Sequence, residues 1–173
     1  MSSSWYKIKL PRVKKMKIWI DADGFPAICR ELLYRIANRC KIETLVVADR
    51  WFELPNSAQL RRVVVQKGAN AADRFIKKNV KEGDIVCSND YALLRQIHQL
   101  SAIGITPYGK IINKDHDIEL PDWYKNIPLM SDVYHYYRHT QTQHSPFSHK
   151  DKAKFANTVD RILQKNLPNI SAY

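Results

Sequence analysis

Four aspartates have the residue type and the spacing that metal-dependent chemistry requires. Asp21 and Asp23 directly follow one short hydrophobic run, Asp90 follows another, and Asp73 opens a helical pattern between the two runs. If both runs are strands of one parallel sheet, these acids lie near the carboxyl ends of the strands, where open α/β sheets bind ligands. Carboxylates that lie close together repel one another unless cations or protons neutralise them. We therefore expect all four to hold Mg²⁺ or Mn²⁺, hard cations that prefer oxygen ligands.

The charge of the whole chain indicates the class of partner. Its 28 Lys and Arg residues against 17 Asp and Glu give a net charge of +11 over 173 residues. This balance favours polyanions as partners, with nucleic acid before membrane surfaces. In an acidic pocket of a basic protein, a divalent cation polarises a phosphoryl oxygen and deprotonates water. The sequence thus predicts a nuclease that hydrolyses phosphodiesters, with RNA as the favoured substrate.

A structural interpretation competes with the catalytic one. An Asp in the turn after a strand is often a helix cap, and Asp73 and Asp90 are each placed to cap the helix that follows. Asp21 and Asp23 favour the functional interpretation, because they stand together directly after a hydrophobic strand. Asp84 precedes its strand, so we expect it at the opposite edge of the sheet and exclude it from the site.

Short hydrophobic runs alternate with helical patterns along the chain, which is typical of an α/β fold. We expect strands at 17–20, 44–48, 62–66, 85–88 and 103–107 and helices at 26–40, 71–80, 91–100, 132–139 and 151–164. No strand is expected beyond residue 110. This order predicts a three-layer α/β/α architecture with a mostly parallel, Rossmann-like sheet and right-handed crossovers.

Length and composition predict a single cytoplasmic domain. We expect a basic extension at 1–15 without ordered structure, one domain at 16–166 and a tail at 167–173. The extension is either a basic arm for phosphate backbones or a leader ahead of a start at Met16, and the leader is favoured. No apolar run is long enough for a bilayer, no signal peptide is visible, and no glycine-rich phosphate loop indicates a nucleotide cofactor.

Two other functions remain open. One is a non-catalytic nucleic-acid-binding module whose metal site is structural or has decayed. The other is a phosphatase of the haloacid dehalogenase type, in which Asp21 would be the nucleophile, Asp23 a general acid and Ser88 the phosphate-binding hydroxyl. Phe25 disfavours the phosphatase, because such enzymes have Thr or Val there.

A segment rich in histidine and tyrosine precedes the last predicted helix. His135 and His139 have the i, i+4 spacing of some zinc sites, but a solvated polar surface is the favoured interpretation. Tyr134, Tyr136 and Tyr137 could stack on bases, although core packing of one or two of them is favoured.

Several segments occur together in the order of one known family. They are MKIWIDADGFP from Met16, GANAAD from Gly68, GDIVCSND from Gly83, PYG from Pro107, and Asp151 with KFAN from Lys154 and Asp160-Arg161. With these segments the chain, from Met16 to about Gln164, resembles the YaiI/YqxD-like family of small bacterial proteins, which are regarded as relatives of the PIN-domain nucleases. The resemblance implies a PIN-like fold and a metal-dependent nuclease site at Asp21, Asp23, Asp73 and Asp90.

Departures from the family pattern affect the site. The family usually has Ala-Cys-Pro where this chain has Gly24-Phe25-Pro26, so a family thiol is absent and cannot be essential here. The family tends to carry a further Asp where this chain has Asn70, which keeps an oxygen ligand but removes a charge and implies a lower metal affinity. Recurrence of the F-A-N string implies a supporting role for Asn157, beside Asn70 and Ser88, although helix packing alone could explain Phe155.

Overall fold

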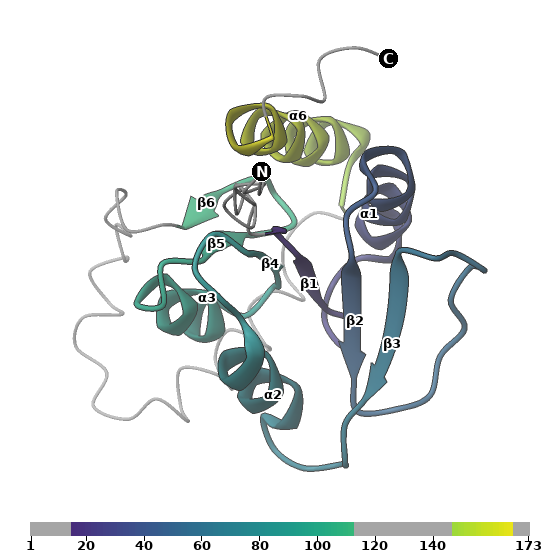
Figure 1. Ribbon diagram of the computed structural model, residues 1–173, viewed down its shortest axis with the longest axis vertical. Helices are drawn as coiled ribbons and strands as arrows, with labels where there is room; N and C mark the ends of the chain where they lie inside the picture. Colours follow the sequence, from purple (N-terminus) through teal and green to yellow (C-terminus); the bar gives the residue numbers. More distant parts are fainter. Residues whose placement is uncertain (1–14, 113–146, 168–173) are drawn as a thin grey trace, which may run out of the picture.

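The computed structural model describes residues 15–112 and 147–167, which contain one six-stranded sheet and four helices (Figure 1). The strands are β1 (Ile18–Asp21), β2 (Thr44–Ala48), β3 (Leu60–Val64), β4 (Ile85–Cys87), β5 (Ile103–Ile105) and β6 (Ile111–Ile112). The helices are α1 (Ala27–Cys40), α2 (Ala71–Asn79), α3 (Tyr91–His98) and α6 (His149–Asn166). The strand order is β3-β2-β1-β4-β5-β6, and every neighbouring pair except β5 and β6 is parallel. The predicted α/β class is confirmed.

Two helix layers cover opposite faces of the sheet, because successive strand residues alternate between two hydrophobic clusters. Ile18 and Ile20 of β1 belong to the cluster that contains Phe155 of α6 and residues of α1. Trp19 belongs to the cluster that contains Ile76 of α2 and residues of α3. Figure 1 shows α1 and α6 on one side of the sheet and α2 and α3 on the other. The three-layer α/β/α prediction is therefore confirmed.

The connections create a topological switch point between β1 and β4. The chain passes from β1 to β2 and β3 on one side, and then crosses through α2 to β4 and β5 on the other side. The loops that follow β1 and β4 consequently diverge, and open α/β sheets bind ligands at such a point. Ile20 pairs with Cys87, so the next residues, Asp21 and Ser88, lie side by side at the carboxyl ends of the two strands.

The strand prediction is wrong at one end of the sheet. A sixth strand, β6, pairs antiparallel with β5, although no strand was expected beyond residue 110. It forms because a turn folds the chain back: Thr106 N–H donates to the Lys110 carbonyl at 3.0 Å, and Lys110 N–H donates to Thr106 Oγ1 at 3.1 Å. The third strand also begins at Leu60 rather than at 62, because Leu60 is the partner of Thr44 in β2. The predicted helix at 132–139 lies outside the described residues, as do nearly all of 1–15 and 167–173.

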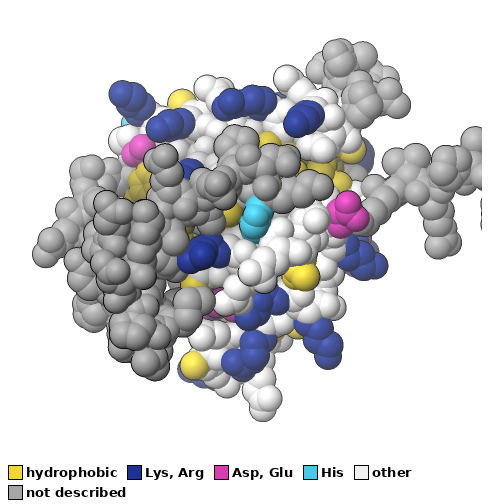
Figure 2. Space-filling model, turned by 90° about the vertical axis from the view of Figure 1, so that its left-hand side faces the viewer, with side chains coloured by type: hydrophobic (Ala, Val, Ile, Leu, Met, Phe, Trp, Pro, Cys, Tyr) yellow, Lys and Arg dark blue, Asp and Glu magenta, His cyan; other side chains and the backbone are white. Residues whose placement is uncertain are grey.

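Basic side chains are spread over the described surface. Figure 2 shows Lys and Arg side chains across the side that faces the viewer, with few Asp and Glu side chains among them. This distribution agrees with the net charge of +11. None of the helices in the described ranges combines the length and the apolar composition of a bilayer-spanning segment.

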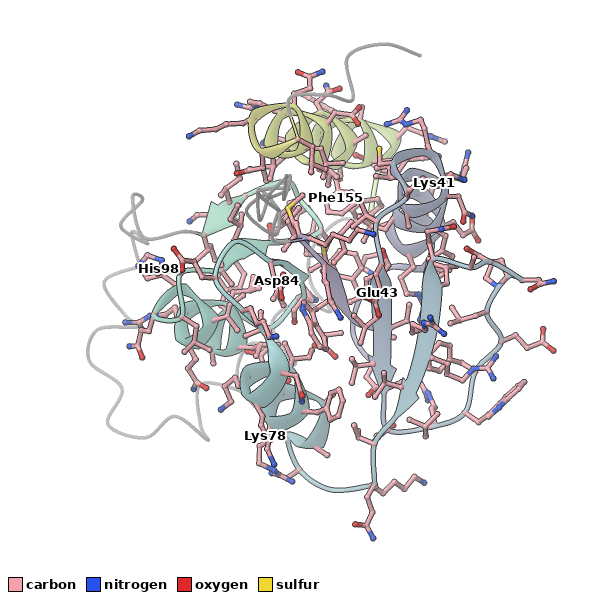
Figure 3. The ribbon with its side chains drawn as sticks, in the orientation of Figure 1. Lys41, Glu43, Lys78, Asp84, His98 and Phe155 are labelled. Carbon is pink, nitrogen blue, oxygen red and sulfur yellow. The ribbon has the colours of Figure 1, made fainter. Side chains whose placement is uncertain are left out.

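The turn before β6 packs closely against α6. Gly109 has a φ of +75°, and its carbonyl accepts a hydrogen bond of 3.0 Å from Thr158 Oγ1. Phe155, one turn before Thr158, is fully buried and points from α6 towards the sheet (Figure 3). These contacts join the PYG segment to the helix that carries the F-A-N string.

Candidate functional site

Asp21 ends β1 on the sheet face that α2 and α3 cover, because it lies two residues after Trp19. Its side chain is 8% exposed, and its Oδ2 accepts a 2.8 Å hydrogen bond from Ser88 Oγ. Burial raises the pKa of Asp21 to about 6. The Ser88 hydroxyl opposes this rise in pKa, and the nearby carboxylates of Asp90 and Asp23 add to it. Asp21 is therefore a buried acid that is held next to other acids.

Ser88 and Asp90 connect Asp21 to the start of α3. The fully buried Ser88 hydroxyl donates to Asp21 and accepts a 2.9 Å hydrogen bond from Asp90 N–H. Asp90 is the N-cap of α3, and its Oδ1 accepts from the N–H groups of Ala92 at 2.7 Å and Leu93 at 3.2 Å. The capping interpretation is confirmed for this residue. The other oxygen, Asp90 Oδ2, is buried and has no hydrogen-bond partner within the described residues.

Asp73 lies partly buried in the first turn of α2 but does not cap it. The N-cap is Asn70, which has a left-handed backbone and makes no side-chain cap bond. Burial, the largest cause, and the nearby carboxylates of Asp90 and Asp21 together raise the pKa of Asp73 to about 7, against a smaller opposing effect of Lys77. Asp73 also lies within hydrogen-bonding reach of Asp90, and two carboxyl groups can share such a bond only while one of them keeps a proton. We call Asp21, Asp73 and Asp90 the acidic cluster.

Asp23 lies at the rim of the acidic cluster. Its Oδ2 accepts a 3.0 Å hydrogen bond from Asp49 N–H, and its Oδ1 lies 3.9 Å from Arg50 Nε. The backbone of Asp23 donates a hydrogen bond to the Asp21 carboxylate. Asp23 therefore ties the loop after β1 to the end of β2. Asp49 and Arg50 were not expected at the site, although their position directly after a strand at the same edge is a signal that could have indicated them.

The other two predicted supporting residues are exposed. Asn70 is exposed at the start of α2, and Asn157 is exposed on α6, which covers the opposite face of the sheet. Asp160 on the same helix pairs with Arg39 of α1 at 3.0 Å. The F-A-N string thus serves helix packing through Phe155, whose ring packs edge-on against another ring of the core. His135 and His139 lie outside the described residues.

Asp84 directly precedes β4 and so lies at the amino end of that strand, opposite to Ser88, as predicted. It is 3% exposed and accepts three hydrogen bonds of 3.0 Å, from Lys17 N–H, Trp19 Nε1–H and Lys81 N–H. These three donors belong to the amino end of β1 and to the turn before β4. Its exclusion from the site is consistent with this structural role.

Neighbouring carboxylates raise the pKa values of Asp21 and Asp73 in the acidic cluster, but the described residues do not form a set of three or more metal ligands. Within 15–112 and 147–167, no group of three or more His, Cys, Asp or Glu side chains is arranged so that it could hold a metal ion. Mg²⁺ in particular is usually held by only one or two carboxylates, with water and substrate phosphate as the remaining ligands. Asp90 Oδ2 accepts no hydrogen bond from an N–H group of the described residues, and the three acids repel one another, so protons or positive charge would stabilise this arrangement.

The repulsion within the acidic cluster should make stability depend on pH. The folded-state pKa values of Asp21 and Asp73 lie above their ordinary value of 3.8, so the folded chain binds these protons more tightly than the unfolded chain. Their contribution to stability is therefore lost as pH rises from about 4 through about 7. Asp73→Asn should raise the unfolding free energy near pH 8 by on the order of 2 kcal/mol and flatten the profile.

Urea denaturation of wild type and Asp73→Asn across this pH range measures the effect. Asp160→Asn is the control, because that carboxylate is part of an exposed ion pair and should contribute less than about 1 kcal/mol at any pH. An Asp73→Asn variant that is less stable than wild type near pH 8 would contradict the coupling.

The chain is similar to a family of bacterial proteins over most of its length. The sequence profile of the family described as "Uncharacterized BCR, YaiI/YqxD family" matches residues 19–165. A UPF0178 protein of Desulfotalea psychrophila is 35% identical over 151 residues, which cover 87% of this chain and 99% of the relative. A UPF0178 protein of Pseudoalteromonas translucida is 31% identical over 155 residues, which cover 87% of this chain and 98% of the relative. No solved structure gives a significant match.

Proposed function

The chain belongs to the YaiI/YqxD (UPF0178) family, and we propose that it is a PIN-like, divalent-metal-dependent nuclease that acts on RNA. The observation that carries the proposal is the buried Asp90 Oδ2, to which no backbone or side-chain N–H of the described residues donates and which lies beside two further carboxyl groups. Such a group needs positive charge from protons or from a cation. The protein is basic, and its buried acids lie at the carboxyl ends of parallel strands. This combination suits a cation that acts on a polyanionic substrate.

Asp21 and Asp90 are the direct ligands that we propose for Mg²⁺ or Mn²⁺, while Asp23 and Asp73 position the ion or the attacking water. A cation bound there would polarise a phosphoryl oxygen of the substrate and lower the pKa of water. Ser88 has a positioning role, because its hydroxyl holds Asp21 and accepts from the backbone of Asp90. Asn70 keeps a supporting role as an exposed oxygen donor three residues before Asp73.

Metal-dependent cleavage of RNA tests the proposal. The purified full chain should cleave a labelled single-stranded RNA in the presence of Mn²⁺ or Mg²⁺, and EDTA should abolish the cleavage. A DNA strand of the same sequence, treated in parallel, distinguishes the two substrates. If RNA cleavage stayed at the same background level without metal, with Mn²⁺ and with Mg²⁺, the proposed nuclease activity would be contradicted.

A non-catalytic nucleic-acid-binding module is the second candidate. It is favoured by the absence, within the described residues, of a complete group of three metal ligands. Such a module would bind RNA with a steep dependence on salt, tolerate EDTA and show no turnover with any metal. A phosphatase of the haloacid dehalogenase type is disfavoured, because the Ser88 hydroxyl that would bind phosphate is already engaged with Asp21 and Asp90.

A further inference from the structure

An open groove lies between β3 and α2, on the same side of the sheet as the acidic cluster. It has a volume of about 410 Å³ and is lined by the end of β3, the loop after it and one face of α2. Its apolar lining includes Val63, Val65 and Phe75. All three also pack against the hydrophobic cluster that contains Trp19 and Ile76. We call it the β3–α2 groove.

The charged lining of the β3–α2 groove is entirely cationic in the described part of the chain. Lys67, Arg74 and Lys78 line it, all three are exposed, and no Asp or Glu is among the lining residues. Figure 3 shows Lys78 reaching outwards from α2 at the end of the molecule away from α6. Arg74 Nη1 donates to the Ala69 carbonyl at 2.5 Å, which holds the guanidinium over the loop that leads into α2.

The first turn of α2 joins the groove to the acidic cluster. Asp73 couples to Asp21 and Asp90, and the next residue, Arg74, lines the groove. Lys78 follows Arg74 at i, i+4, so both cations lie on one face of the helix. A ligand that runs along this face therefore approaches the carboxyl ends of β1 and β4.

The shape and the charge of the groove indicate the class of ligand. Sites for small molecules bury most of the ligand surface, which an open groove does not do. Separate cations along a groove without carboxylates match the repeated phosphates of a nucleic-acid strand. The Phe75 ring also lines the groove; it is half-buried against Trp19, so only the part that faces the groove is open to a base, a contact that tolerates any sequence.

We propose that the β3–α2 groove binds the backbone of a single-stranded RNA and leads it towards the acidic cluster. Lys67, Arg74 and Lys78 contact phosphates along the strand. The choice of RNA rests on the proposed function, whereas the groove itself rests on its own shape and charge.

Fluorescence anisotropy with a labelled oligouridine tests the groove in EDTA, where a metal-dependent nuclease cannot cut. The Lys67→Ala/Arg74→Ala/Lys78→Ala variant should bind at least about tenfold more weakly, and the slope of log K against log salt should fall by about 2. A Lys67→Ala/Lys78→Ala variant keeps the bond from Arg74 to Ala69 and should show an intermediate loss.

The matched control is Arg35→Ala/Arg161→Ala/Lys165→Ala, which removes the same charge from exposed positions on α1 and α6. It should keep most of the affinity. Equally weakened RNA binding by both triple variants, or no RNA binding by the wild type, would contradict the proposal that the β3–α2 groove binds RNA. Weakening confined to the groove variant, in a protein that shows no cleavage with any metal, supports the groove and rejects only the nuclease. Metal-dependent cleavage with equal binding by both triple variants rejects only the groove.

Discussion

Asp21→Asn should lower metal-dependent RNA cleavage by at least about 100-fold while leaving the fold intact. The amide has nearly the same shape as the carboxylate, and its oxygen can still accept the hydrogen bond from Ser88 Oγ. It lacks the negative charge that we propose for holding the cation. Burial already disfavours this charge, as the pKa of about 6 shows, so its removal should not reduce stability at neutral pH.

Initial cleavage rates with Mn²⁺ and thermal unfolding of the same preparations measure both parts of this result. Mn²⁺ should raise the melting temperature of wild type, because a ligand that binds only the folded state stabilises it. It should raise that of Asp21→Asn much less. Glu31→Gln, an exposed change on α1, is the control and should keep full activity. Cleavage by Asp21→Asn at the wild-type rate would refute the role of the acidic cluster.

Gly109→Ala should reduce the unfolding free energy by about 3 kcal/mol. The φ of +75° lies in the region that side chains other than glycine rarely adopt. The new Cβ would also lie 2.9 Å from the carbonyl oxygen of Lys154 and 3.0 Å from Thr158 Oγ1, so α6 would have to move. A loss of this size lowers the melting temperature of a domain of this length by roughly 10 °C.

Gly24→Ala is the matched control for stability. A Cβ at Gly24 meets no atom within 4 Å, and its φ is not in the left-handed region. Its unfolding free energy should therefore change by less than about 0.5 kcal/mol. Equal melting temperatures for Gly109→Ala and wild type would show that the turn and α6 do not depend on this close contact.

The layers of the fold could be predicted from the sequence because the strands and helices follow simple patterns. The run at 17–20 and the helix that begins near Pro26 are separated by a loop that neither pattern can continue, so their order and type were evident. The β6 strand was missed because two residues carry no periodicity, and only the turn at Pro107 and Gly109 folds them back. The start of β3 was misplaced because pairing with Thr44, rather than local preference, sets it.

The part of the site that lies at the ends of strands could be predicted from the sequence. Asp21, Ser88 and Asp90 follow neighbouring parallel strands, so the position of each along its strand was enough to bring them together. The placement of Asn157 could not be predicted, because the sequence shows the exposed and buried sides of a helix but not which face of the sheet that helix covers. The cations of the β3–α2 groove were missed for a related reason, although the i, i+4 spacing of Arg74 and Lys78 was visible.

Asp84 has a consequence for how this protein would respond to mutation. Its three hydrogen bonds hold the starting ends of β1 and β4 together. In this way Asp84 helps to set the strand alignment that places Asp21 beside Ser88 at the other end of the strands, about 10 Å along β1. β1 and β4 are only four and three residues long, so these hydrogen bonds add to the register that their buried side chains already specify. A survey of inactive variants would consequently include Asp84 among the essential acids, and only its distance from the substrate would reveal that it aligns the scaffold instead of taking part in the reaction.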